Sequence, residues 1–190
     1  ASAIASLEKP VIGITNGVDY AIFNPATDPV LTSRYDAEDP SNKGRSKTAA
    51  LRVLELVLET DRPLVLALAE LTEEKGFDLL AQSLPQLLKH DFSLIVAGKG
   101  SASIEKKLEA TRERHRDRVA LTAPTDATAV RRLYAAADLV LLPSRNEPCG
   151  MSQRVTQRYG AVPVAPASGG VLDTVVDCDA ALDTGTGFLF

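Results

Sequence analysis

Short apolar runs alternate with amphipathic segments along most of this sequence, and this alternation limits its possible folds more than any other feature. The runs are mostly continuous rather than interrupted by polar residues, as in "PLVLALA" (63–69) and "FSLIVAG" (92–98). Continuous apolar runs of this length are typical of strands buried on both faces, which occur in parallel sheets. We predict strands over residues 11–15, 63–69, 92–98, 118–122, 138–143 and 161–166.

The segments between these runs carry apolar residues at helical spacing. We predict helices over residues 46–58, 76–89, 104–115, 127–137, 151–159 and 170–176, with Pro85 kinking or shortening the second of them. Residues 16–43 are rich in Pro, Asp, Asn and Ser and are expected to form a long irregular excursion. The alternation predicts an α/β fold with a Rossmann-like, doubly wound parallel sheet. Such sheets bind ligands at the carboxyl ends of their strands.

Length and charge narrow the classes of function. The chain has 190 residues, enough for one domain with its own core, and its net charge of −4 argues against a protein that mainly binds nucleic acid or anionic membrane. Cys149 and Cys178 show no metal spacing and suit a reducing compartment. The first residues do not resemble a signal peptide, so we expect a soluble intracellular protein. The sequence does not begin with Met, and we expect it to be a piece of a longer protein.

Two of the loops that follow predicted strands have features of a binding site. "ELTEEKG" (70–76) places Lys75 at the start of a helix, where the dipole favours an anion, so a bound phosphate would explain the cation. The alternative is a solvated lysine balanced by the neighbouring glutamates. Gly98 and Gly100 follow the next strand and leave room for a ligand to approach the backbone, although an ordinary turn would also explain them.

The segment "PSRNEPCGMSQ" (143–153) is the strongest of these signals. Two prolines stiffen the loop and fix Glu147 just beyond a strand end, while Gly150, Met151 and Ser152 begin a helix with free backbone N–H groups. A carboxylate beside such amides suits a ligand that carries both sugar hydroxyls and phosphate. "SGGVLDT" (168–174) repeats the pattern, because Gly169 and Gly170 leave room at another helix start. A surface glutamate and an ordinary glycine turn are the alternatives.

Several motifs resemble the C-terminal half of bacterial glycogen synthase and plant starch synthase. They occur in the family's order over nearly the whole chain: "NGVDYAIFNPATDP", "LTEEKGFDLL", "YAAADLVLLPSRNEPCGMSQ", "RYGAVPV" and "GGVLDTVVD". The resemblance implies a retaining glucosyltransferase of the GT-B type, with two Rossmann-like domains facing across a cleft. Residues 1–190 then correspond to the C-terminal nucleotide-sugar-binding domain, and the N-terminal acceptor domain is absent from this chain.

The resemblance also implies a reaction and the residues that serve it. Glucose would be transferred to the non-reducing end of an α-1,4-glucan with retention of configuration. The expected donor is ADP-glucose rather than UDP-glucose, and no metal or other cofactor is expected. The matching positions make Lys75 the lysine that holds the donor diphosphate and Glu147 the glutamate on the donor glucose. Gly150, Met151 and Ser152 match the helix start that meets the phosphates. The implied compartment is the cytoplasm, or the plastid if the source is a plant.

Some positions depart from the family pattern. Glu70 stands where the family has an arginine that binds the diphosphate, and Thr125 stands where many members place an aromatic residue against the adenine. Both changes fall on the nucleotide half of the predicted donor site. Further departures are Asn146, Arg154 and Thr156.

These departures leave two alternatives beside a working donor domain. The first is a noncatalytic domain of the same ancestry, kept for glucan binding or for assembly with an active synthase. The second is a transferase for a different sugar nucleotide, with Glu70 contacting an altered donor group.

Overall fold

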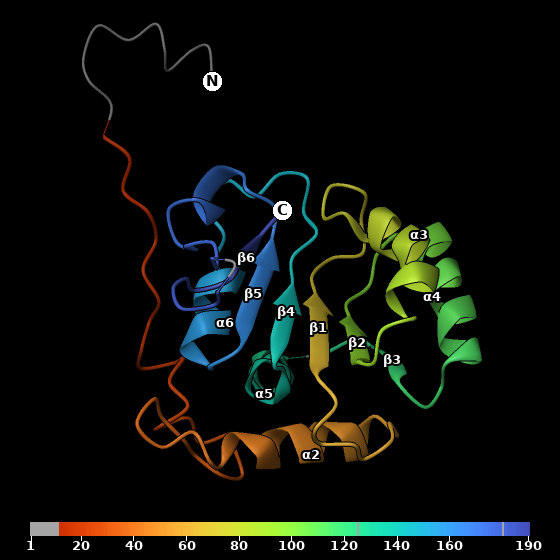
Figure 1. Cartoon of the computed structure of the whole chain (residues 1–190), viewed down its shortest axis with the longest axis horizontal. Helices are drawn as coiled ribbons and strands as arrows, with labels where there is room; N and C mark the ends of the chain where they lie inside the picture. The colour runs from red at the N-terminus through yellow and green to blue at the C-terminus, as the bar shows by residue number, and fades with distance from the viewer. Residues whose placement is uncertain (1–11, 125, 180) are drawn as a thin grey trace, which may run out of the picture.

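In the computed structural model, which describes residues 12–124, 126–179 and 181–190, a six-stranded sheet in the order β3-β2-β1-β4-β5-β6 forms the centre of the molecule (Figure 1). Each strand runs parallel to its neighbours. The strands are β1 (Leu64–Leu68), β2 (Ser93–Ala97), β3 (Val119–Thr122), β4 (Leu139–Leu141), β5 (Val162–Ala165) and β6 (Phe188–Leu189). The order reverses between β1 and β4, as in a doubly wound fold.

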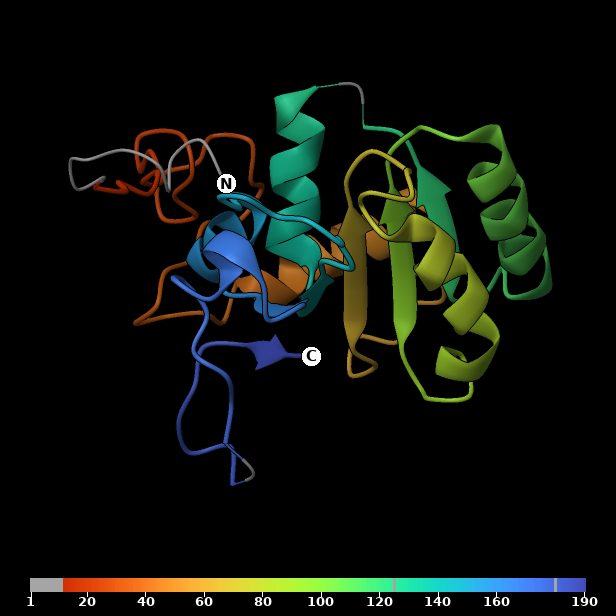
Figure 2. The same cartoon turned by 90° about the horizontal axis from the view of Figure 1, so that it is seen from above.

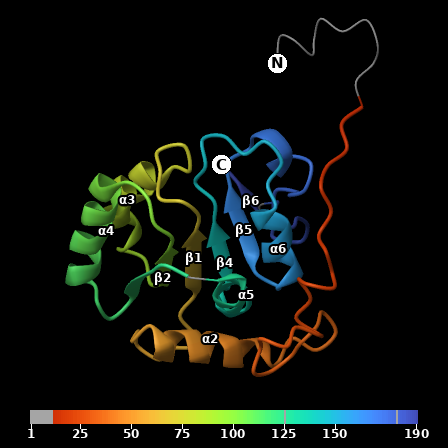
Figure 3. The same cartoon turned by 180° about the vertical axis from the view of Figure 1, so that it is seen from behind.

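Helices connect the strands and cover the sheet. They are α2 (Lys43–Val53), α3 (Phe77–Leu87), α4 (Ala102–Arg114), α5 (Ala127–Ala136), α6 (Ser152–Arg158) and the 3₁₀ helix η1 (Gly169–Val171). Figures 1 and 2 show α3 and α4 side by side, and Figure 3 shows α2 crossing below α5. No helix within the described residues has the length and apolar character needed to cross a bilayer.

Successive residues of the central strands bury their side chains on opposite faces of the sheet. Leu64 and Leu66 of β1 pack with α2 and α5 in one apolar cluster, whereas Ala67 packs with α3 and α4 in the other. Ile95 and Val96 of β2 divide in the same way. Because both faces are covered, these strands have no polar face, which explains the continuous apolar runs in the sequence.

The predicted strand at residues 11–15 is not formed by the residues that the structure describes, 12–15. This part of the chain runs outside the body of the domain, apart from the sheet (Figure 1). The side chains of Ile12 and Ile14 are 82% and 91% exposed. An apolar pattern becomes a strand only where a neighbouring strand accepts its backbone hydrogen bonds, and this segment has no such neighbour within the described chain.

The predicted helix at residues 170–176 is also wrong. Only the short helix η1 forms, and turns follow it. The side chain of Gln157 donates to the carbonyl of Thr174, and Thr174 Oγ1 donates back to the carbonyl of Gly170. The backbone beyond these bonds pairs with the returning chain instead of continuing a helix, since the N–H of Thr186 donates to the carbonyl of Val176 and the N–H of Cys178 donates to the carbonyl of Gly187. Strand β6, which lies beyond this segment, was not predicted.

The expected irregular excursion is confirmed, since residues 16–42 contain no helix or strand. It is fixed to the domain by side chains rather than by regular structure. Tyr35 donates to the carbonyl of Tyr159 at 2.8 Å, and the guanidinium of Arg158 lies 4.3 Å from the ring centroid of Tyr20. Pro85 lies in the last turn of α3, which ends two residues later at Leu87.

Candidate functional site

The carboxyl ends of β1 and β4 meet where the strand order reverses, and the loops that follow them lie side by side above the sheet (Figure 1). The first loop covers residues 69–76 and leads into α3. The second covers residues 142–151 and leads into α6. Ligands of doubly wound sheets bind at this position, so the side chains of these two loops define the candidate site.

Lys75 and Glu147 face each other across these loops. Lys75 Nζ lies 3.0 Å from Glu147 Oε2, and the two side chains are 30% and 21% exposed. The pair joins residues that are 72 positions apart in the sequence. An ammonium and a carboxylate thus stand together at the end of the sheet, and both remain accessible to a ligand.

Gly76 allows the two loops to approach so closely. It precedes α3 with a φ of 72°, a left-handed conformation that favours glycine. A Cβ atom at this position would lie 1.9 Å from the carbonyl oxygen of Pro143. Any side chain here would push the loop after β4 away from Lys75.

Arg145 joins the same two loops and was not predicted as a site residue. Its backbone N–H donates to the carbonyl of Glu74 at 2.9 Å. Its guanidinium donates to both carboxylate oxygens of Asp78, at 2.6 and 2.8 Å, and to the carbonyl of Glu73. The hydrogen bond from Arg145 holds the pKa of Asp78 down at about 2. The sequence signal for this contact was only an arginine in a stiff loop and an acidic residue in the first turn of a helix.

The "SGG" turn brings a third loop to the site. The N–H of Gly170 donates to the carbonyl of Glu147 at 3.1 Å. Cβ atoms at Gly169 and Gly170 would lie 2.3 Å from the carbonyl oxygen of Glu147 and 2.4 Å from that of Cys149. These glycines therefore support the backbone of the loop that carries Glu147.

Gly150, with a φ of 60°, lies against the side chain of the buried Gln153. Helix α6 begins at Ser152, with Met151 as its N-cap residue. The amide of Gln153 donates to Thr174 Oγ1 at 3.0 Å and so ties α6 to the segment after η1. Sequence reasoning missed Gln153, because a glutamine in the first turn of a helix gives no sign of burial.

Gly98 and Gly100 lie one strand away, in the loop after β2. Cβ atoms there would lie 1.9 Å from the carbonyl oxygen of Ala69 and 2.4 Å from that of Leu71. The N–H of Leu71 also donates to the carbonyl of Lys99 at 2.9 Å. Close packing of two loops therefore explains both glycines without a ligand. A cavity of about 470 Å³ opens beside them, with Lys99 in its lining.

The departures from the family pattern occupy different environments. Glu70 is exposed at the start of the loop after β1, and Asn146 is exposed beside Glu147. Thr156 is fully buried, and its hydroxyl donates to the carbonyl of Ser152 at 2.7 Å, which satisfies the polar group inside the domain. Thr125 lies outside the described residues.

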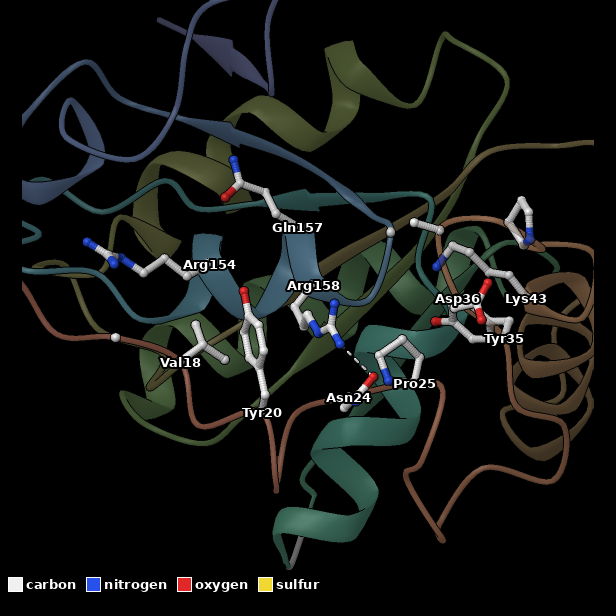
Figure 4. Close-up of a pocket in the computed structure, with 14 residues that line it drawn as sticks. Val18, Tyr20, Asn24, Pro25, Tyr35, Asp36, Lys43, Arg154, Gln157 and Arg158 are labelled. Carbon is white, nitrogen blue, oxygen red and sulfur yellow. Dashed lines mark hydrogen bonds between the residues drawn. The ribbon is translucent and has the colours of Figure 1, made fainter.

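A second cavity, of about 600 Å³, lies between the excursion and α6, and neither Lys75 nor Glu147 lines it (Figure 4). Two of its basic side chains, Lys43 and Arg158, are engaged in hydrogen bonds within the protein, and Arg154 also lines it. Lys43 donates to the carbonyls of Ala135 and Tyr159, and Arg158 donates to Asn24 Oδ1 at 2.6 Å. We therefore place the candidate site at the Lys75–Glu147 pair rather than in this cavity.

A doubly wound parallel sheet with an ion pair at its switch point defines the chain as a Rossmann-like ligand-binding domain. Residues 55–190 match the family model of the glycosyl transferases group 1, and the chain belongs to this family. It is 42% identical over 178 residues to a glycogen synthase of Anaeromyxobacter sp., and the match covers 94% of this chain and 37% of that protein. A glycogen synthase of Moorella thermoacetica is 39% identical with nearly the same coverage.

Solved structures agree with this assignment. The catalytic domain of starch synthase IV from Arabidopsis thaliana, bound to ADP and acarbose, superposes with a TM-score of 0.83 and 34% identity, covering 94% of this chain and 38% of that one. The C-terminal domain of a group 1 glycosyl transferase from Francisella tularensis shares the fold, with a TM-score of 0.61. The resemblance to glycogen and starch synthases and the predicted GT-B-type α/β fold are confirmed. The chain spans little more than a third of the length of the curated relatives described above.

Proposed function

We propose that this chain is the donor-binding domain of a glycogen or starch synthase, which transfers glucose from ADP-glucose to the non-reducing end of an α-1,4-glucan with retention of configuration. The observation that carries this proposal is the Lys75–Glu147 pair at the switch point of the sheet. The similarity to proteins named glycogen synthase and starch synthase supports the choice of reaction.

Lys75 and Glu147 have complementary roles in this proposal. The ammonium of Lys75 binds the donor diphosphate, and the carboxylate of Glu147 accepts hydrogen bonds from the hydroxyls of the donor glucose. As ADP departs, negative charge builds on the diphosphate, and a cation already held in place stabilises that charge most in the transition state. The ion pair orients the two side chains toward each other at the position where the donor would bind.

Other residues complete the proposed donor site. The backbone N–H groups of Gly150, Met151 and Ser152 have no acceptor among the described residues, which leaves them available to phosphate oxygens. Gly169 and Gly170 pack against the backbone of the loop that carries Glu147 and support it beside these N–H groups. The cavity beside Gly98 and Gly100 offers space for the nucleoside.

The acceptor half of the reaction requires more protein than this chain contains. We propose that the N-terminal domain of a GT-B enzyme supplies the glucan-binding surface and faces the Lys75–Glu147 edge. The donor domain on its own then binds the sugar nucleotide and transfers no glucose.

Glu70 favours a second candidate function. A carboxylate in place of the family's arginine repels a diphosphate. At ~5 Å and an effective dielectric near 20, one such charge interaction is worth about 3 kcal/mol before screening by salt. The loss of attraction and the added repulsion would therefore weaken donor binding strongly. The chain would then be a noncatalytic domain for glucan binding or assembly, or a domain for another sugar nucleotide.

Calorimetric titration with ADP-glucose and ADP tests the proposal. We expect saturable binding that Lys75→Ala weakens and that Glu70→Arg strengthens. Lys89→Ala, an exposed lysine beyond the other end of α3, is the matched control and should bind like the parent. An affinity for ADP-glucose that is the same in Lys75→Ala as in the parent would contradict the proposal.

The same titrations separate the alternatives. No binding by the parent together with clear binding by Glu70→Arg would support the noncatalytic domain. A panel of nucleotide sugars would identify another donor, because preference for a base other than adenine would support a different transferase.

A further inference from the structure

The two proposed donor-contacting side chains come from loops that are far apart in sequence, so something must hold those loops in register. Gly76 permits the close approach of the loop after β4, but a glycine has no side chain that could hold that loop in one orientation. The contacts that can do so belong to Arg145, which lies two residues before Glu147. Its partner Asp78 lies three residues after Lys75.

We propose that Arg145 and Asp78 are positioning residues that clamp the loop after β4 to the start of α3 and thereby set Lys75 opposite Glu147. The fork of the guanidinium meets both oxygens of the carboxylate, at 2.6 and 2.8 Å. Two parallel hydrogen bonds resist rotation as well as separation, which a single bond does not.

Contacts with backbone carbonyls fix the clamp to the residues that precede Lys75. The N–H of Arg145 donates to the carbonyl of Glu74, and its guanidinium donates to the carbonyl of Glu73. Arg145 therefore contacts the loop after β1 on the residues just before Lys75, and α3 at Asp78, two residues after Gly76. Lys75 lies between these anchor points, so its backbone has little freedom to move relative to Glu147.

A structural role alone does not account for this arrangement. Arg145 is 43% and Asp78 16% exposed, so solvent screens this pair and limits its contribution to the free energy of unfolding. The domain core lies elsewhere, in the clusters on the two faces of the sheet. The geometry of the donor site is more sensitive, because a shift of about 1 Å can cost about a hundredfold in activity.

The carboxylate of Asp78 remains ionised at neutral pH, because the hydrogen bond from Arg145 holds its pKa at about 2. Pairing with Asp78 also keeps the Arg145 cation on the α3 side of the loop. Lys75 is then the side-chain cation directed at Glu147. The cation that positions the loop, Arg145, is therefore a different residue from the cation that would bind the donor, Lys75.

The test uses the whole chain and a readout that needs no donor. Brief treatment with a limiting amount of acetic anhydride, followed by peptide mass spectrometry, measures how fast each lysine reacts. In Asp78→Asn and in Arg145→Lys, labelling of Lys75 should rise about threefold or more, because the loosened loop exposes its amine for more of the time. Exposed Lys89 and buried Lys47 should not change.

Lys47 reports on folding in the same experiment, since it reacts only if the domain opens. Arg145→Lys keeps the charge but lacks the fork, so it remains informative if Asp78→Asn unfolds the chain. Arg116→Lys is the matched control, because Arg116 pairs with Glu113 away from the site and should leave Lys75 unaffected. Unchanged labelling of Lys75 in both clamp variants would overturn the inference.

The consequence for donor binding rests on the proposed function and is measured separately. By calorimetry, both clamp variants should bind ADP-glucose about tenfold more weakly than the parent. If Lys75 labelling rises while no protein binds ADP-glucose, the clamp stands and the proposed function fails. If donor binding by the parent is clear and Lys75 labelling does not respond, the clamp fails and the proposed function stands.

Discussion

A Cβ atom on Gly76 would lie 1.9 Å from the carbonyl oxygen of Pro143. This relationship ties the residue that caps α3 to the first residues of the loop that carries Glu147. No real side chain tolerates such a distance, so the contact depends on glycine. The φ of 72° at Gly76 adds a second requirement for glycine at the same position.

Gly76→Ala should therefore lower the free energy of unfolding by about 2 kcal/mol or more, since strain at φ and a backbone clash act together. Urea denaturation measures this loss. Gly44→Ala in α2 is the matched control, because a Cβ there meets nothing within 4 Å. That variant should be stabilised by up to about 1 kcal/mol, as alanine forms helices better than glycine. Equal effects in the two variants would show that the Pro143 contact is not rigid.

The sheet could be predicted from the sequence because its central strands are buried on both faces. Leu64–Leu68 and Ser93–Ala97 show no polar alternation, and a loop and then a helix follow each of them. Strand β6 could not be predicted, because two residues at an edge, Phe188–Leu189, carry no pattern. The apolar run at residues 11–15 shows the opposite error, since a pattern alone does not supply a neighbouring strand.

Part of the site could be predicted for the same reason. Lys75 and Glu147 follow strands whose carboxyl ends must lie at one edge of a parallel sheet, so their proximity follows from topology. The contact between Arg145 and Asp78 does not, because it depends on side-chain directions across 67 positions of sequence. The close packing of Gly98 could not be predicted either, since a Cβ there would lie 1.9 Å from the carbonyl oxygen of Ala69, in a loop far away in sequence.

The ion pair between Lys47 and Asp138 should contribute to stability. Lys47 Nζ lies 2.6 Å from Asp138 Oδ2, with exposed side-chain fractions of 8% and 37%. Lys47→Met should lower the free energy of unfolding by about 2 kcal/mol, less than for a fully buried pair because Asp138 is partly solvated. Lys106→Met, an exposed lysine on α4, should change it by less than about 0.5 kcal/mol.

A double variant tests whether the loss comes from the pair. Lys47→Met combined with Asp138→Asn should be about 1 kcal/mol more stable than the sum of the single changes predicts. Simple additivity would assign the Lys47 effect to its other hydrogen bond, to the carbonyl of Thr60.

Tyr159 and Asp28 form a buried contact that should be costly to break. Tyr159 OH donates to Asp28 Oδ2 at 2.5 Å, and Arg131 Nε lies 3.0 Å from the same oxygen. Tyr159→Phe leaves the buried carboxylate with one partner fewer, so the free energy of unfolding should fall by about 1–3 kcal/mol. Tyr20→Phe, at a tyrosine that is 59% exposed, should change it by less than about 0.5 kcal/mol.

The same tyrosine gives this prediction a pH dependence. Burial, and then the hydrogen bond to Asp28, raise the pKa of Tyr159 above its ordinary value of 10.0. The unfolded chain therefore releases the phenolic proton first, and the parent should lose stability above about pH 10 more steeply than Tyr159→Phe. Parallel stability curves for the two proteins would contradict the raised pKa.

The pKa of Lys43 should lie well below that of an ordinary lysine. Its ammonium donates to the carbonyls of Ala135 and Tyr159. Burial, with a smaller contribution from Lys47, lowers its pKa from 10.5 to about 8. Between these two values the unfolded chain holds a proton that the folded chain has released, so stability attributable to Lys43 rises with pH in this window and is lost as the pH falls through 8.

Nuclear magnetic resonance of the lysine Cε signals measures this titration directly. The Lys43 signal should move with a midpoint near pH 8 rather than at the ordinary lysine pKa of 10.5. In urea denaturation, the parent should gain stability between pH 8 and 10 relative to Lys43→Met, which cannot release a proton there. A Lys43 midpoint at the ordinary value of 10.5 would mean that water reaches the ammonium and that the excursion covers it less tightly than the contacts of Tyr35 and Arg158 indicate.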